Sequence, residues 1–180
     1  MKLSSREVAL IIVFTALSVT SNYLLAGIPN VVIMDTIVFV IGYCFGFSIG
    51  ALTGAFSWTI YGFLNPYGFS LPIWVATMLS ESLYSAFGSL AKRINLMGPK
   101  SKDGLGSVGV KLALLGFLST FLYDFVTNAI FGLTFFGPTT ASIYLALITG
   151  SYFALLHEIS NAIFFFAGVI PLVTVLDRSH

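Results

Sequence analysis

Long apolar runs separated by short polar breaks make up most of the chain. Runs of about 20 apolar residues can cross a bilayer as helices, because the hydrocarbon core is about 30 Å thick. The breaks contain turn-forming residues, as in GIPN at 27–30, NPYGFSLP at 65–72 and FGPTT at 136–140. The pattern predicts an all-α membrane protein with six transmembrane helices, at residues 8–26, 31–43, 47–64, 71–91, 112–136 and 143–170.

A hydrophilic segment at residues 92–111 sets the orientation of these helices. It carries five of the eight Lys and Arg residues, and the other three are Lys2, Arg6 and Arg178. Basic residues stay on the cytoplasmic side of short membrane loops, so this loop and both termini are predicted to be cytoplasmic. An even number of crossings must then precede the loop, and an even number must follow it.

The run at residues 31–64 must be divided to satisfy this count. It contains no proline, and as a single helix it would be about 51 Å long, well over the thickness of the hydrocarbon core. We place the break within GYCFG, residues 42–46, which leaves one helix at 31–43 and another at 47–64.

The composition supports one membrane domain covering residues 1–180. Hydrophobic residues make up 57% of the chain and charged residues 8%, which is typical of a multi-pass protein of the cell membrane and not of a soluble domain. The first run could also be a signal peptide, but it is longer than the usual apolar core of about 7 to 15 residues. The basic residues lie where topology requires them, so no nucleic-acid partner is expected.

Two short patterns resemble catalytic motifs without their structural context. GLGSVG at 104–109 matches the dinucleotide-binding GxGxxG, but no strand precedes it. HEISN at 157–161 has Asn161 where the zinc motif HExxH has its second histidine, and Cys44 is the single cysteine. The chain also lacks the GxxxxGK[ST] motif of ATPases. We therefore expect no enzymatic activity, no cofactor and no metal site.

Polar residues inside the apolar runs are the candidates for function. They are Asp35, Glu81, Asp124, Asn128, His157, Glu158 and Asn161. A charged side chain at the bilayer centre costs roughly 2.5 to 3.5 kcal/mol. Four acids with one histidine and no Lys or Arg cannot all be paired as ions. Some must be protonated or face a wet cavity, or a cationic ligand must supply the missing charge. For each residue, a hydrogen-bonded contact between helices stays an open alternative.

Four segments together resemble one family of membrane proteins. They are AGIPNVV at 26–32, GYCFGFSIGALTGA at 42–55, YDFVTN at 123–128, and HEISNAIFF at 157–165 with PL at 171–172. Their order and spacing are similar, over nearly the whole chain, to those of the substrate-binding S components of energy-coupling factor (ECF) transporters. The similarity is greatest to the vitamin-type members, which include candidate binders of cobalamin precursors.

The resemblance implies a high-affinity binding subunit for a vitamin or vitamin precursor, which captures its substrate at the outer face of the membrane. It also implies partners, namely a transmembrane T component and two cytoplasmic ATPase subunits. By the same resemblance, the substrate site is expected at Asn30, Asp35, Tyr67, Trp74, Glu81, Asp124 and Asn128. Docking on the T component is expected at small residues of the first helix, here Ala16 and Thr20.

Other functions stay open on the sequence. A self-sufficient secondary transporter or a channel would use the buried acids as a proton or cation relay. A metal-uptake S component would need histidine or carboxylate ligands near the outer face, where only Asp35 is evident. A purely structural subunit would explain the glycines spaced every fourth residue from Gly42 to Gly54, but not the buried acids.

Overall fold

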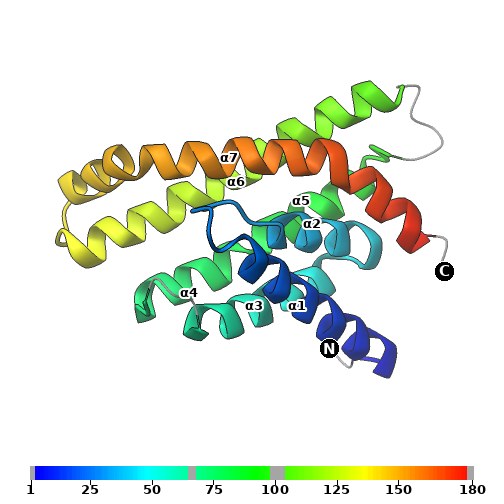
Figure 1. The fold of residues 1–180 in the computed structure, drawn as a ribbon, viewed down its shortest axis with the longest axis horizontal. Coiled ribbons are helices and arrows are strands. Elements are labelled where there is room, and N and C mark those ends of the chain that lie inside the picture. The colour runs from blue at the N-terminus through cyan, green and yellow to red at the C-terminus, as the bar shows by residue number, and fades with distance from the viewer. Residues whose placement is uncertain (1–2, 65–67, 98–103, 178–180) are drawn as a thin grey trace.

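The computed structural model describes residues 3–64, 68–97 and 104–177. Within these ranges the protein is all-α, with seven helices and no strand (Figure 1). The helices are α1 (Ser5–Leu25), α2 (Met34–Phe45), α3 (Phe47–Leu64), α4 (Leu71–Ser80), α5 (Ser82–Arg93), α6 (Leu105–Phe135) and α7 (Thr140–Asp177). Four of them, α1, α3, α6 and α7, are long and apolar enough to cross a membrane.

The outer surface of the bundle is apolar. Large hydrophobic side chains point outward from several helices, with exposed fractions of 81% for Leu24, 77% for Leu105 and 71% for Ile148. Such a surface is unfavourable in water and favourable against lipid tails. Together with the four long apolar helices, it indicates a multi-pass membrane protein.

Helix α2 lies at the centre of the bundle. Ten of its twelve residues are buried, and it contacts α1, α3, α5 and α7. A helix that is apolar on all sides must be covered by other helices or by lipid, and here other helices cover it. At 1.5 Å per residue it is about 18 Å long, which is too short to cross the hydrocarbon core alone.

Helices α2 and α5 approach each other closely at a glycine. A side chain at Gly88 would collide with the backbone carbonyl of Phe39, so only glycine permits this contact. The Ser89 hydroxyl, one residue further along α5, donates a hydrogen bond of 2.9 Å to the carbonyl of Gly42. The same contact surface therefore combines close backbone packing with a polar link between the helices.

The break predicted within residues 42–46 is confirmed at Gly46, the single residue between α2 and α3. Its φ angle of 94° lies in the region that favours glycine over other residues. Helix α2 starts at Met34 and not at residue 31. The residues before it form a turn that contains Pro29, and Asn30 there has a φ of 56°.

Several other predicted boundaries are wrong. Helix α6 begins at Leu105 and not at 112, so only residues 94–104 of the predicted 92–111 loop lie between helices. Val108 of this extra turn joins the buried core with Val173 of α7, and their burial extends both helices. Helix α7 accordingly runs past the predicted end at 170. It contains Pro171, which removes a backbone donor, and its last turns bend (Figure 1).

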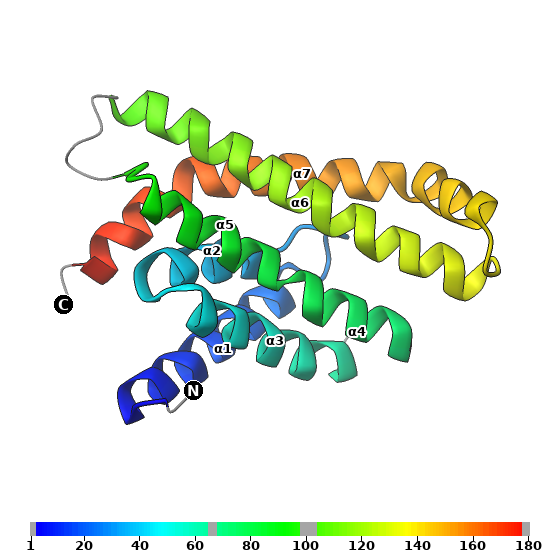
Figure 2. The ribbon, with the colours of Figure 1, turned by 180° about the vertical axis from the view of Figure 1, so that it is seen from behind.

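The predicted helix at 71–91 is divided at Glu81 into α4 and α5. Figure 2 shows the two segments following each other along nearly one line. Residues 71–93 together are about 35 Å long, enough to cross a bilayer. The division places the buried Glu81 at a junction between two helices and not within a regular helix.

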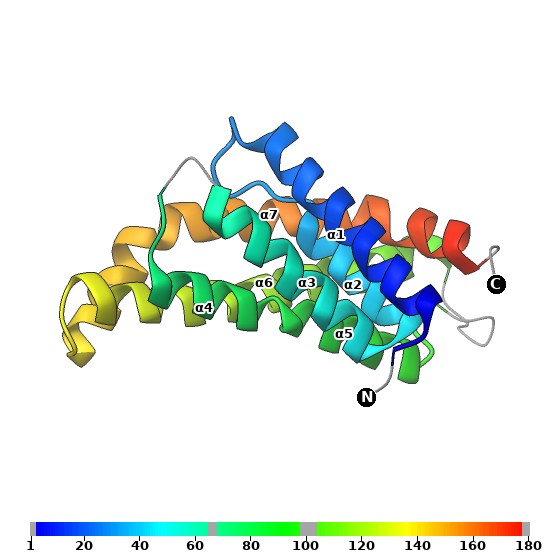
Figure 3. The same ribbon diagram turned by 90° about the horizontal axis from the view of Figure 1, so that it is seen from below.

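The two ends of the bundle differ in character (Figures 1 and 2). The start of α1, the end of α5, the start of α6 and the end of α7 gather at one end, where Lys92 donates a hydrogen bond of 3.0 Å to the carbonyl of Cys44. The turn between α6 and α7 lies at the other end. Figure 3 shows that the loop after α1, the end of α3 and the start of α4 also lie away from that end.

Candidate functional site

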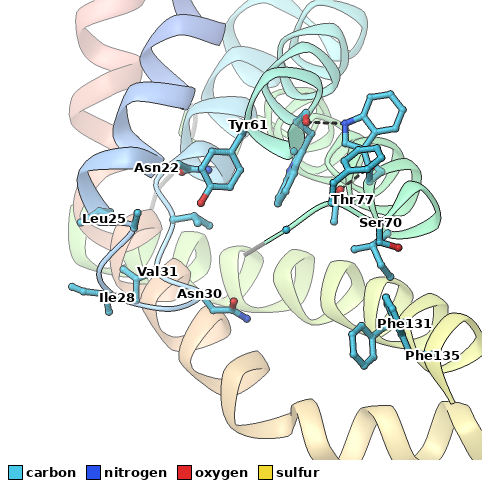
Figure 4. Close-up of a pocket in the computed structure, with 18 residues that line it drawn as sticks. Asn22, Leu25, Ile28, Asn30, Val31, Tyr61, Ser70, Thr77, Phe131 and Phe135 are labelled. Carbon is cyan, nitrogen blue, oxygen red and sulfur yellow. Dashed lines mark hydrogen bonds between the residues drawn. The ribbon is translucent and has the colours of Figure 1, made fainter. Parts of the chain in front are cut away.

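A cavity of about 570 Å³ opens between four parts of the chain. Its walls come from the end of α1 with the following loop, the last turns of α3, the start of α4 and the last turns of α6 (Figure 4). Aromatic side chains dominate the lining, namely Trp58, Tyr61, Phe69, Trp74, Phe131 and Phe135. The volume and the apolar lining are typical of a site for a small organic molecule.

Two tryptophans form one wall of the cavity, and neither indole N–H is directed to a ligand. Trp74 Nε1 donates to the Trp58 carbonyl at 3.1 Å, and Trp58 Nε1 donates to Glu81 Oε2 at 2.8 Å. Gly62 leaves room for the Trp74 ring, which any side chain at this position would displace. The indoles therefore offer ring surfaces to the cavity and not hydrogen-bond donors.

Two asparagines supply polar groups at the cavity (Figure 4). Asn22 is 2% exposed, and its Oδ1 accepts no hydrogen bond from any described residue. Asn30 lies in the loop after α1, where its Nδ2 donates to the carbonyl of Phe153 on α7 at 3.2 Å. A buried acceptor without a donor costs free energy, and Asn22 Oδ1 lies just beneath the surface of the cavity wall.

Charged side chains are absent from the described lining of the cavity. Described basic residues lie near the terminal end, as with Lys92 of α5. An anionic ligand would therefore meet no cationic side chain among the described lining residues.

A buried acid–histidine–acid contact lies inside the bundle. His157 of α7 places Nε2 2.8 Å from Asp35 Oδ2 and Nδ1 3.0 Å from Asp124 Oδ1. Each contact needs a hydrogen between nitrogen and oxygen, and a neutral imidazole has a single N–H. The trio must therefore contain either an imidazolium or a neutral imidazole with at least one protonated acid.

Asn161 extends this polar network across the core. Its Nδ2 donates to Asp35 Oδ2 at 2.6 Å and to Thr120 Oγ1 at 2.8 Å. Thr120 in turn accepts a hydrogen bond of 3.1 Å from the hydroxyl of Tyr84. The network thus joins α2, α5, α6 and α7, as expected for polar groups that must find partners away from water.

Glu81 connects the cavity wall with this interior. It is 0% exposed, and its Oε1 has no hydrogen-bond partner among the described residues. Behind Trp58, the ring of Tyr123 stacks at a centroid distance of 6.4 Å. Tyr123 also meets the edge of the His157 ring at 5.7 Å. Trp58 therefore contacts the cavity on one side and the buried polar groups on the other.

The predicted substrate residues fall into separate places. Asn30 and Trp74 line the cavity, whereas Asp35 and Asp124 belong to the buried network. Glu81 lies between the two through its bond to Trp58. Asn128 packs against Gly150 in the contact between α6 and α7, away from the cavity lining. Tyr67 lies outside the described residues.

The predicted docking residues lie on the outer side of α1. Ala16 and Thr20 are exposed, while the buried positions of α1 are Ile11, Thr15, Ser18 and Asn22. The exposed side of this helix therefore carries small side chains beside large apolar ones such as Leu17.

Sequence reasoning missed most of the cavity wall. Trp58 and Tyr61 lie within one turn of each other near the end of α3, just before the loop that leads to Trp74. That spacing is a signal that could have identified them. No local signal indicated Asn22, or Phe131 on the distant α6, because their role depends on which helices meet.

Comparisons with protein-family models, curated proteins and solved structures give no match. The geometry defines the class in coarse terms, as an all-α, multi-pass membrane protein with an aromatic cavity and a buried polar network.

Proposed function

We propose that the chain is the substrate-binding subunit of an ECF-type, ATP-driven importer of a vitamin or vitamin precursor. The observation that carries the proposal is the aromatic cavity, which is of ligand size and lies away from the end where the termini gather. With the basic segments in the cytoplasm, this cavity belongs to the outer half of the protein. A binding subunit that captures its substrate from outside needs this arrangement.

The proposed topology has six crossings with both termini in the cytoplasm. Helices α1, α3, α6 and α7 are the four long crossings. The joined α4 and α5 supply a fifth, and the short, buried α2 with the loop before it supplies the sixth. Four crossings, from α1 to the joined α4 and α5, then precede the basic segment, and two crossings, α6 and α7, follow it. Both numbers are even, as cytoplasmic termini and a cytoplasmic basic segment require.

Two features support the proposed partners, namely the absence of an ATPase motif from the sequence and the exposed small residues of α1. It contains no nucleotide-binding motif of the Walker type, so ATP hydrolysis requires the two ATPase subunits. The T component would dock on α1, where Ala16 and Thr20 are exposed. Small residues at this position permit close approach of another helix.

A second candidate is a self-sufficient, proton-coupled transporter. The contact of His157 with Asp35 and Asp124 favours it, because buried carboxylate and histidine groups form proton relays in membrane transporters. The described residues contain no group of three or more His, Cys, Asp or Glu side chains arranged to hold a metal ion. These residues therefore give no support to the metal-uptake alternative.

Reconstitution in liposomes separates the two candidates. The chain alone should bind substrate without accumulating it, and should accumulate it only with the T component, the ATPases and ATP. The substrate would be identified by mass spectrometry of small molecules retained by the purified protein. Uphill accumulation by the chain alone, driven by a proton gradient, would refute the ECF proposal and support the second candidate.

A further inference from the structure

Several hydrogen-bond donors at the cavity wall are used inside the protein. Both indole N–H groups and the Asn30 amide donate to other residues. The Thr77 hydroxyl likewise donates to the carbonyl of Trp74 at 3.0 Å. Asn22 Oδ1, in contrast, is an acceptor without a donor. The wall therefore leaves few described donors for a ligand that only accepts hydrogen bonds.

The ring surfaces of the wall add to this preference. Tyr61 lies edge-on to Trp58 at a centroid distance of 5.6 Å, and Trp74 borders the same cavity. The faces of aromatic rings carry negative potential and attract cations. Because Trp58 donates its N–H to Glu81, a negative charge on Glu81 makes the face of this indole still more attractive to a cation.

The charge balance of the core points in the same direction. Asp35, Glu81 and Asp124 are 2%, 0% and 5% exposed, and no Lys or Arg is buried among the described residues. The single histidine can balance the charge of at most one of these three acids, so ionisation of the others leaves negative charge without a counter-charge among the described residues. A cation in the adjacent cavity would supply positive charge to this region of low dielectric constant, whereas an anion would be repelled.

Resting on the proposed function, we infer that the cavity selects a substrate with a flat ring and a positively charged, hydrogen-bond-donating nitrogen group. Trp58 is the surface on which this group lies, and Glu81 is the residue that determines the preference for positive charge. Glu81 acts through Trp58, so it is a specificity-determining residue that does not line the cavity.

Three isosteric probes test the inference on the purified chain. Benzamidinium, benzamide and benzoate share one ring and the same number of non-hydrogen atoms, and they differ in charge. Probes of this size bind with dissociation constants of about 1 mM, which calorimetry and ligand-observed NMR can measure. We expect benzamidinium to bind at least tenfold more tightly than benzoate, with benzamide between them.

Single substitutions test whether Glu81 causes the preference for benzamidinium. Glu81→Gln should abolish most of the advantage of benzamidinium over benzamide. Trp58→Phe is a second test, for use if Glu81→Gln fails to fold. It keeps a ring but removes the N–H to Glu81, and it should reduce the same advantage. Glu158→Gln is the matched control, because Glu158 is also buried, at 7% exposed, but has no hydrogen bond to the cavity wall. It should leave all three affinities unchanged.

The experiment separates failure of the charge preference from failure of the cavity as a ligand site. Equal or tighter binding of benzamide or benzoate would overturn the inference and leave the proposed function standing. An equal effect of Glu81→Gln and Glu158→Gln would refute the role of Glu81. Failure of all three probes to bind would remove the cavity as a ligand site, and with it the observation that supports the proposed function. Assembly with the T component tests the proposed function independently of any probe.

Discussion

Replacing His157 by leucine should destabilise the protein strongly. Both ring nitrogens contact carboxyl groups, at 2.8 Å for Asp35 and 3.0 Å for Asp124. The Coulomb attraction of an ion pair at such a distance is about 5 to 6 kcal/mol before desolvation, with an effective dielectric constant of about 20. Desolvation offsets most of it while the network is intact. Leucine removes the group that links the two buried acids, and leaves Asp35 with its hydrogen bond from Asn161 and Asp124 without the imidazole.

Removal of one partner from a buried charge pair typically costs about 3 to 5 kcal/mol. For a chain of this length the corresponding fall in Tm is about 6 to 20 °C. Equilibrium unfolding in detergent, followed by the fluorescence of Trp58 and Trp74, would measure the free energy. Ser160→Ala is the control on the same helix, because the Ser160 hydroxyl only bonds the carbonyl of His157 at 3.0 Å, and it should cost about 0.5 kcal/mol or less.

A triple variant tests the reason for this cost. Combining His157→Leu with Asp35→Asn and Asp124→Asn removes both acids along with the imidazole. Because replacing a whole buried ionic group is less costly than breaking it, the triple variant should be more stable than His157→Leu alone. A loss below about 1 kcal/mol in the single variant, or a triple variant less stable than the single one, would refute the network as a stabilising unit.

Three other predictions concern the cavity, the partner and the topology. Trp74→Ala should weaken substrate binding at least tenfold, or about 1.4 kcal/mol by calorimetry; an unchanged affinity in folded protein would place the substrate elsewhere. Ala16→Leu should reduce co-purification with the T component and leave substrate affinity unchanged, because a bulky side chain prevents close helix approach; equal loss of both would mean that this side of α1 serves folding. In a Cys44→Ala background, a cysteine at Asn95 should be labelled only from the cytoplasm and one at Thr139 only from outside. Labelling of both from the same side would refute the proposed topology.

The sequence determined the helical character of the protein and the approximate positions of its helices. Runs of apolar residues must form helices in lipid, because every backbone donor and acceptor needs an internal partner there. The length of the run at 31–64 and the even number of crossings placed a break within residues 42–46. The structure has it at Gly46, whose φ of 94° favours glycine. Local rules failed at Pro171, where packing of Val169 and Val173 in the core continues the helix past the proline.

Only the tertiary structure decided which polar residues meet. The sequence marked Asp35, Asp124 and His157 as costly in lipid, but their contacts join residues separated by 122 and 33 positions. Hydrophobic periodicity shows which residues are buried and not which buried residues face one another. The cavity depends in the same way on α1, α3, α4 and α6 meeting around one space. Its position follows from helix packing, which involves contacts between distant segments and therefore leaves no local pattern in the chain.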